Sequence, residues 1–404
     1  MDLTRRKFLQ LSGISALGAV IFNGCSIPEE ELQVQSPLEI PEDVVAGGEA
    51  WYATLCRQCS SVDGILVRVM EGRAKKVEGN PDYPLNVGKH SASCEAALQD
   101  LYHPDRIQQP HRLVGPRGSG EFEPISWDEA LNTLVQQLNQ TAGDPSRMLM
   151  ITDPLRGHLG MVADKFAKTY GASRVEFEPM ERLVLRRAIS DVFGQDRIPY
   201  FDIKNTKYLL SFGADFLGTW VSPVSHSIGY GEFRQGSGRT RGTMVQVDPR
   251  FSMTAISADY WVPVKPGTEG LLALGIAREM ISDPELLPYL DGEAVNAFTG
   301  GVGVAALHNY TPESVASETG LTGYYGEEIA VKKIHDLAKG FATNRPSLAI
   351  GGDAAAASTN GLFNLSAIYA LNYLVGSVGA EGGVQFTPLS PIEGIPDTAT
   401  GASL

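Results

Sequence analysis

The chain has 404 residues, a formal net charge of −14 at pH 7 and four cysteines. This acidic balance excludes a protein that binds nucleic acid by general electrostatic attraction, so no nucleic-acid partner is expected. The length supports two or three domains with cores of their own. Four cysteines, one of them close to the N-terminus, make a poor disulfide framework.

Residues 1–25 predict an export signal. Arg5 and Arg6 form a twin-arginine pair, and the apolar run that follows is too short to span a bilayer. The run ends at Gly24-Cys25, which resembles a lipoprotein processing site, so lipidation of Cys25 is a candidate modification. A short membrane anchor is the alternative. We expect the mature chain in the periplasm or on the outer face of the cytoplasmic membrane, where a lipid on Cys25 would hold it.

Residues 26–49 and 50–107 predict a linker followed by a small β-rich domain. The first range is rich in Pro and Glu and should be extended. In the second, two alternating runs at 64–70 and 74–79 flank Glu71-Gly72, which predicts a hairpin. A helix is expected over 96–102.

From residue 108 the pattern predicts an α/β fold with a doubly wound parallel sheet. Short apolar runs, each typical of a strand buried on both faces, alternate with helical runs. The expected strands are 148–151, 208–212, 244–247 and 347–350, and the expected helices are 128–138, 161–170, 183–193 and 271–281. We assign 108–340 to one α/β domain and 341–404 to the returning, incomplete segment of a split second one. Ligands bind at the carboxyl ends of such strands.

The cysteine pattern at residues 56–94 predicts a degenerate iron–sulfur site. A [4Fe–4S] cluster requires about four thiolates. Cys56 and Cys59 have the right spacing, but Asp63 and Ser91 stand where further thiolates are expected, and Cys94 lies three residues beyond. Cys94 would have to reach inward through a loop rearrangement. A Cys56–Cys59 disulfide or free thiols are the alternatives to a cluster.

Together these motifs resemble the molybdopterin oxidoreductase family, whose cofactors are molybdenum bis-molybdopterin guanine dinucleotide (Mo-bisMGD) and [4Fe–4S]. The matching stretches are Cys56-x2-Cys59 with 64–69 and 78–81, 124–130, 211–215 with 247–250 and 266–270, and 360–361 with 376–383. The resemblance implies that six residues at the strand ends belong to a dinucleotide site: Gly213, Asp215, Asp248, Arg250, Gly267 and Glu269. They can equally shape the strand ends without a ligand, and we expect a vestigial site.

The metal-ligand position of the family falls in residues 175–183, which contain no Cys or Ser. Glu178 or Glu181 could bind a metal, although acidic residues also favour the start of a helix. We therefore expect no catalytic residue, no bound metal and neither family cofactor in this chain.

Residues 177–179, 198–202 and 212–220 resemble the molybdopterin-like subunits of alternative complex III. The resemblance implies a non-catalytic scaffold in a membrane-associated quinol:electron-acceptor oxidoreductase. Its implied partners are a ferredoxin-like iron–sulfur domain or subunit, a quinol-binding integral membrane subunit and c-type cytochrome subunits. The alternatives are the empty subunit of a related quinone-reductase complex, a catalytic Mo-bisMGD subunit of the tetrathionate- or polysulfide-reductase type, and a structural lipoprotein.

Family members continue beyond the length of this chain. We therefore expect a fragment or the product of a split gene. We also expect the apolar face near residues 365–374 to be left unpaired.

Overall fold

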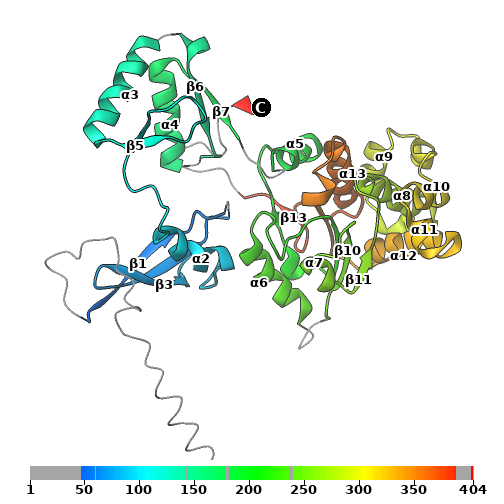
Figure 1. Ribbon diagram of the computed structural model, residues 1–404. Coiled ribbons are helices and arrows are strands. Elements are labelled where there is room, and N and C mark those ends of the chain that lie inside the picture. Colours follow the sequence, from blue (N-terminus) through cyan, green and yellow to red (C-terminus); the bar gives the residue numbers. More distant parts are fainter. Residues whose placement is uncertain are drawn as a thin grey trace, which may run out of the picture.

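The computed structural model describes residues 47–59, 61–141, 144–155, 157–177, 182–235, 240–387 and the strand at 402–403. Figure 1 shows three groups of elements in chain order: a small blue unit, a cyan and green unit, and a larger body. The signal residues Arg5, Arg6 and Cys25, and the acidic Glu178 and Glu181, lie outside the described residues. No helix in the described part of the chain is both long and apolar enough to cross a membrane.

The blue unit is the expected β-rich domain. Strands β1 (Glu49–Leu55), β2 (Gly64–Met70) and β3 (Arg73–Gly79) form an antiparallel sheet in that order, so the predicted hairpin is confirmed. Helix α2 (Ala92–Leu101) begins four residues earlier than expected. The reason is its N-cap: the Ser91 hydroxyl accepts a hydrogen bond from the Cys94 amide and starts the helix there.

The second unit contains a small parallel sheet with the order β14-β7-β6. Its helix α3 begins one residue before the expected range 128–138, directly after Ser126, whose hydroxyl accepts a hydrogen bond from the Glu129 amide at 3.2 Å as in a capping box. Its elements are β4 (His111–Leu113), β5 (Phe122–Pro124), α3 (Trp127–Thr141), β6 (Leu149–Thr152), α4 (Gly157–Tyr170), β7 (Ser173–Glu176) and β14 (Ala402–Ser403).

The larger body is built on a parallel sheet with the order β11-β10-β9-β12. Its strands are β9 (Tyr208–Phe212), β10 (Thr243–Val247), β11 (Tyr260–Val262) and β12 (Ser347–Gly351), and β8 (Tyr200–Phe201) pairs with β13 (Val384–Gln385) beside it. Its helices are α5 (Arg182–Phe193), α6 (Pro223–Arg234), α7 (Met253–Ile256), α8 (Glu269–Ser282), α9 (Gly292–Phe298), α10 (Pro312–Glu318), α11 (Leu321–Tyr325), α12 (Glu327–Thr343) and α13 (Gly361–Leu374).

The strands expected from the sequence are all present, and they divide between two sheets. The strand expected at 148–151 is β6 of the second unit, whereas β12, expected in the returning segment, pairs directly with β9. Sequence pattern identifies a buried strand but not its neighbours, since pairing depends on contacts between distant residues.

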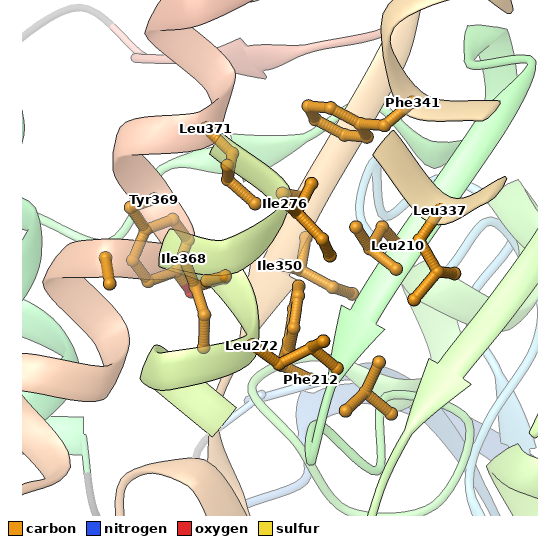
Figure 2. Close-up of a cluster of buried hydrophobic side chains, with 14 of the residues drawn as sticks. Leu210, Phe212, Leu272, Ile276, Leu337, Phe341, Ile350, Ile368, Tyr369 and Leu371 are labelled. Carbon is orange, nitrogen blue, oxygen red and sulfur yellow. The ribbon is translucent and has the colours of Figure 1, made fainter. Parts of the chain in front are cut away.

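Residues 365–374 are not left unpaired, which corrects the expectation. Helix α13 packs against α8 and α5, and its Ile368 and Leu371 are fully buried. Figure 2 shows the apolar cluster in which side chains of α8, α12 and α13 meet those of β9 and β12. The helices that cover α13 come from earlier in the same chain, so its apolar face has an internal partner.

Candidate functional site

The first candidate site is the cysteine pocket of the blue unit, formed by Cys56, Cys59, Asp63, Ser91 and Cys94. Cys56 follows β1, Asp63 precedes β2 and Cys94 lies in the first turn of α2, and all three are buried. The Cys56 amide donates to the Asp63 carbonyl at 2.8 Å, which closes the loop between the strands. The Cys94 thiol donates to the Asp63 carboxylate, with Sγ and Oδ2 3.7 Å apart.

Ser91 and Cys59 complete this pocket. The Ser91 hydroxyl lies 3.3 Å from the Cys94 sulfur, and the half-buried Cys59 sulfur lies 2.9 Å from the Ser61 hydroxyl. Cys94 is displaced by three residues in the sequence, yet its side chain already lies in the pocket beside Asp63 without the loop rearrangement that we expected it to need. Because Ser91 caps α2, the third residue of that helix already points into the core.

The electrostatics of the pocket favour neutral groups. Burial, aided by a hydrogen bond with Cys94, raises the pKa of the Cys56 thiol to about 12. Burial also raises the pKa of Asp63, although its hydrogen bond from Cys94 acts in the opposite direction. One Asp63 oxygen, Oδ1, is buried without a hydrogen-bond partner. The pocket therefore holds groups that resist ionisation.

These residues do not fit a [4Fe–4S] cluster. Thiolates are its ligands, whereas two of the expected positions carry the harder oxygen donors of Asp63 and Ser91. The Asp63 carboxylate already accepts a hydrogen bond from the Cys94 thiol. Within the described ranges, no group of three or more His, Cys, Asp or Glu residues is arranged to hold a metal ion. Cys56, Cys59 and Cys94 are free, so the alternative Cys56–Cys59 disulfide is not formed.

The second candidate site lies at the carboxyl ends of β9, β10 and β12. The structure brings together Gly213, Asp215, Asp248 and Arg250, as expected for parallel strands. The Arg250 guanidinium lies 3.6 Å from the Asp215 carboxylate, and the Arg250 amide donates to Asp248 at 2.9 Å. The Asp215 amide donates to the Asp353 carboxylate at 2.8 Å, and the Thr254 hydroxyl also donates to Asp215. These polar groups bond to one another.

Gly213 is needed by the fold itself. Its φ is 65°, and a Cβ at this position would lie 2.7 Å from the Ala355 amide nitrogen. The turn after β12 therefore occupies the space beside this glycine.

Gly267 and Glu269 lie at the start of α8. The Gly267 carbonyl accepts a hydrogen bond from the Asn360 side chain at 2.6 Å. Glu269 is fully buried, and its Oε2 accepts from the Asn364 side chain at 3.2 Å. Its other oxygen has no partner, and burial raises the pKa of Glu269 to about 7. The negative charge of Asp248 is a smaller contribution to this increase.

This arrangement does not fit a guanine dinucleotide diphosphate. Burial raises the pKa of Asp248, Glu269 and Asp353, and in each case the negative charge of a neighbouring carboxylate contributes to the increase, so carboxylates lie close together at the strand ends. Added phosphate charge would be repelled unless cations offset it. Arg250 is the cationic residue among the six that the sequence assigned to this site. Its side chain is 71% exposed and already faces Asp215.

Asp353 and Asn364 were not among the six predicted residues of this site. Asp353 lies three residues beyond the end of the predicted strand 347–350, and that position was a usable signal. It also has a φ of 42°, which is uncommon outside glycine. Asn364 lies inside an apolar helix, where nothing in the local sequence marks it as a partner of Glu269.

At the expected metal-ligand position, Glu176 is buried and paired with Arg174 at 2.8 Å.

Two family models match the sequence. The molybdopterin oxidoreductase model covers residues 106–390, and the model of the family's Fe4S4 domain covers residues 49–90. The second match coincides with the unit that holds the cysteine pocket.

Curated relatives match almost the whole chain. The molybdopterin-binding-like subunit of menaquinone reductase from Nitratidesulfovibrio vulgaris is 27% identical over 96% of this chain and 53% of its own length. The molybdopterin-containing subunit of the arsenate respiratory reductase from Shewanella sp. (strain ANA-3) is 27% identical over 95% of this chain and 47% of its own length. The chain thus spans about half the length of these relatives.

Among solved structures, acetylene hydratase from Pelobacter acetylenicus matches with a TM-score of 0.60 and 21% identity. The match covers 80% of this chain and 43% of the other, and it supports the fold. With the family model matching most of the sequence and this fold likeness, the chain belongs to the molybdopterin oxidoreductase family.

Proposed function

We propose that this chain is a non-catalytic, molybdopterin-like scaffold subunit of a membrane-associated quinol:electron-acceptor oxidoreductase of the alternative complex III type. The observation that carries the proposal is the hydrogen bond from the Cys94 thiol to the Asp63 carboxylate in the cysteine pocket. It uses two of the groups that a cluster would need, and Asp63 stands where a thiolate is expected.

The strand-end site supports the same proposal. Its acidic groups accept hydrogen bonds from neighbouring backbone amides, and Asp215 also faces Arg250, so the loops serve to hold the ends of β9, β10 and β12 together. The chain then contributes a folded surface to the complex. Electrons pass through clusters of a ferredoxin-like partner and onward to cytochrome subunits, and quinol binds in an integral membrane subunit.

A related quinone-reductase complex is the second candidate. The relative from Nitratidesulfovibrio vulgaris is described as a molybdopterin-binding-like subunit of menaquinone reductase, which favours this assignment. The two candidates share a scaffold without its own redox chemistry and differ in the direction of quinone chemistry. Measuring whether the purified complex oxidises a quinol or reduces a quinone separates them.

A catalytic molybdenum subunit is the competing candidate from another class. The arsenate and thiosulfate reductase relatives are described as molybdopterin-containing subunits. That candidate requires a bound metal and pterin, whereas the scaffold requires neither. Elemental analysis of the purified complex for molybdenum, together with a fluorescence assay for oxidised pterin, therefore tests the proposal.

We expect no stoichiometric molybdenum or pterin on this chain, and iron only on a ferredoxin-like partner. Electron paramagnetic resonance of the reduced complex gives an independent reading, because Cys56→Ala should leave all cluster signals unchanged. Stoichiometric molybdenum, or a cluster signal that disappears in Cys56→Ala, would return the chain to the catalytic candidate.

We further propose delivery by the twin-arginine route to the outer face of the cytoplasmic membrane, with Cys25 as the lipid attachment site. The support is the Arg5-Arg6 pair ahead of a short apolar run.

A further inference from the structure

The N-terminal unit has a very small hydrophobic core. Among its described residues, the cluster of buried apolar side chains consists of Cys56, Ile65, Val77 and Cys94. A unit of this size buries little apolar surface, and small secreted domains are commonly held together by disulfides for that reason. Two of the four core side chains are thiols, so this core itself contains the groups for a cross-link.

Cys56 and Cys94 already meet inside this core. Cys56 follows strand β1 and is 3% exposed, Cys94 lies in the first turn of α2 with no exposed surface, and a hydrogen bond joins their side chains. Cys59 is different, because it is half-buried, lies outside the cluster and has its sulfur 2.9 Å from the Ser61 hydroxyl. The thiol contact in the core is therefore between Cys56 and Cys94.

The backbone on both sides of this contact is fixed by hydrogen bonds. The Cys56 amide donates to the Asp63 carbonyl at 2.8 Å, and the Cys94 amide donates to the Ser91 hydroxyl at 3.2 Å in the cap of α2. Val62, next to Asp63, has a φ of 54°, which a β-branched residue adopts only where its surroundings hold it. The fold thus holds the two thiols near each other before any covalent bond forms.

The Cys94 thiol has a proton acceptor beside it. Its Sγ lies 3.7 Å from the Asp63 carboxylate, to which it donates, and the Ser91 hydroxyl donates to the same sulfur at 3.3 Å. Thiol–disulfide exchange proceeds through a thiolate. The carboxylate can take the thiol proton, and the hydroxyl can stabilise the thiolate that remains.

We propose that Cys56 and Cys94 form an intramolecular disulfide when the chain meets a disulfide oxidant, such as glutathione disulfide or an oxidised thiol oxidoreductase. The S–S bond of the oxidant breaks and the Cys56–Cys94 S–S bond forms. The two cysteines lose two electrons to the oxidant, and their two thiol hydrogens pass to its sulfurs, so that it leaves as two thiols.

The disulfide would tie α2 to the end of β1 and so staple the small core. It would also remove from the pocket two sulfurs that could otherwise bind a metal. The pairing does not depend on the proposed scaffold role. Only its formation in the cell rests on the proposed export to an oxidising compartment.

Peptide mapping of the purified chain tests the pairing without reference to export. The chain is equilibrated in a glutathione buffer with the oxidised form in excess, alkylated, and digested without reductant for mass spectrometry. We expect a cross-linked pair of peptides that contain Cys56 and Cys94, with Cys59 alkylated or carrying glutathione. An unlinked Cys56 and Cys94, or a Cys56–Cys59 link, would overturn the proposal.

Two single variants provide the matched comparison. Cys59→Ser should keep the cross-linked peptides, whereas Cys94→Ser should leave Cys56 without a link to α2. Circular dichroism checks that both variants are folded. Loss of the link in a folded Cys59→Ser chain would assign the bond to Cys59 and contradict the proposal.

Hydrogen exchange of α2 gives a second measurement in the full chain. A disulfide restricts the unfolded ensemble, so oxidation should slow the exchange of residues 92–101 more than about tenfold. The exchange of α12 in the larger body should stay the same, and Cys94→Ser treated in the same way should show no slowing. Equal exchange of α2 in the oxidised and reduced wild-type chain would count against the link.

Discussion

Cys94 donates its thiol hydrogen to the Asp63 carboxylate across a distance of 3.7 Å, inside the core of the N-terminal unit. The two residues are 31 positions apart, and the capped start of α2 brings them together. This bond joins the helix to the hairpin where the family's Fe4S4 domain model matches. The pocket is therefore filled by the chain's own side chains.

Restoring the missing thiols should restore iron binding. Asp63→Cys together with Ser91→Cys supplies four cysteines at the family's spacing, so we expect this variant to take up iron and sulfide in anaerobic reconstitution. The wild-type chain should gain none that survives desalting. Iron analysis and visible absorption measure the outcome.

The matched control for this gain is Ser61→Cys with Ser93→Cys, which adds two thiols at neighbouring positions. It should remain without a cluster. In the Asp63→Cys/Ser91→Cys variant, the loss of the Ser91 cap should cost about 1 kcal/mol of unfolding free energy, which a thermal melt can detect. Equal iron uptake by the wild-type chain would contradict this account of the pocket.

Glu269 should make the stability of the larger body decrease as the pH rises. Burial raises its pKa from 4.5 to about 7, so the folded state binds a proton more tightly than the unfolded chain does. The stabilisation is complete below the unfolded pKa and is lost as the pH rises toward 7. The largest possible effect is about 3 kcal/mol, at 1.36 kcal/mol per pKa unit.

Glu269→Gln should therefore raise the denaturant midpoint at pH 8 and change it little at pH 5. The exposed Glu328→Gln is the matched control and should change neither value. If the Glu269 variant shifted the two midpoints equally, the raised pKa would not be the cause.

Gly213 should not tolerate a side chain. Alanine there would combine an unfavourable φ of 65° with a Cβ placed 2.7 Å from the Ala355 nitrogen. We expect a loss of about 1–3 kcal/mol in unfolding free energy. Gly231→Ala, where a Cβ in α6 meets nothing within 4 Å, should be neutral or stabilising by up to about 1 kcal/mol. Denaturant unfolding of both variants checks the contrast.

Export should depend on the arginine pair. With Arg5 and Arg6 both replaced by Lys, we expect unprocessed protein to accumulate in the cytoplasm, as shown by fractionation and immunoblotting. Cys25→Ser should leave translocation intact but remove a lipid-sized mass from the mature N-terminus. Normal delivery of the double Lys variant would rule out the twin-arginine route.

The sequence alone determined the elements of this protein and its family. Strands such as 208–212 and 347–350 are short apolar runs, and helices such as 183–193 show a local period, so both can be read without knowledge of distant contacts. The replacement of thiolates by Asp63 and Ser91 is likewise a matter of residue identity and spacing. It already separated this chain from members with a complete cluster motif.

Tertiary structure decided which of these groups meet. It turned Cys94 toward Asp63, covered α13 with α8 and α5, and buried Glu269 with one oxygen left unpaired. It also left every described residue of α3 at least partly exposed. None of this is encoded in a local pattern, because burial and its electrostatic consequences depend on residues tens to hundreds of positions apart. Secondary structure follows from neighbours in the chain, whereas packing depends on which distant surfaces exclude water together.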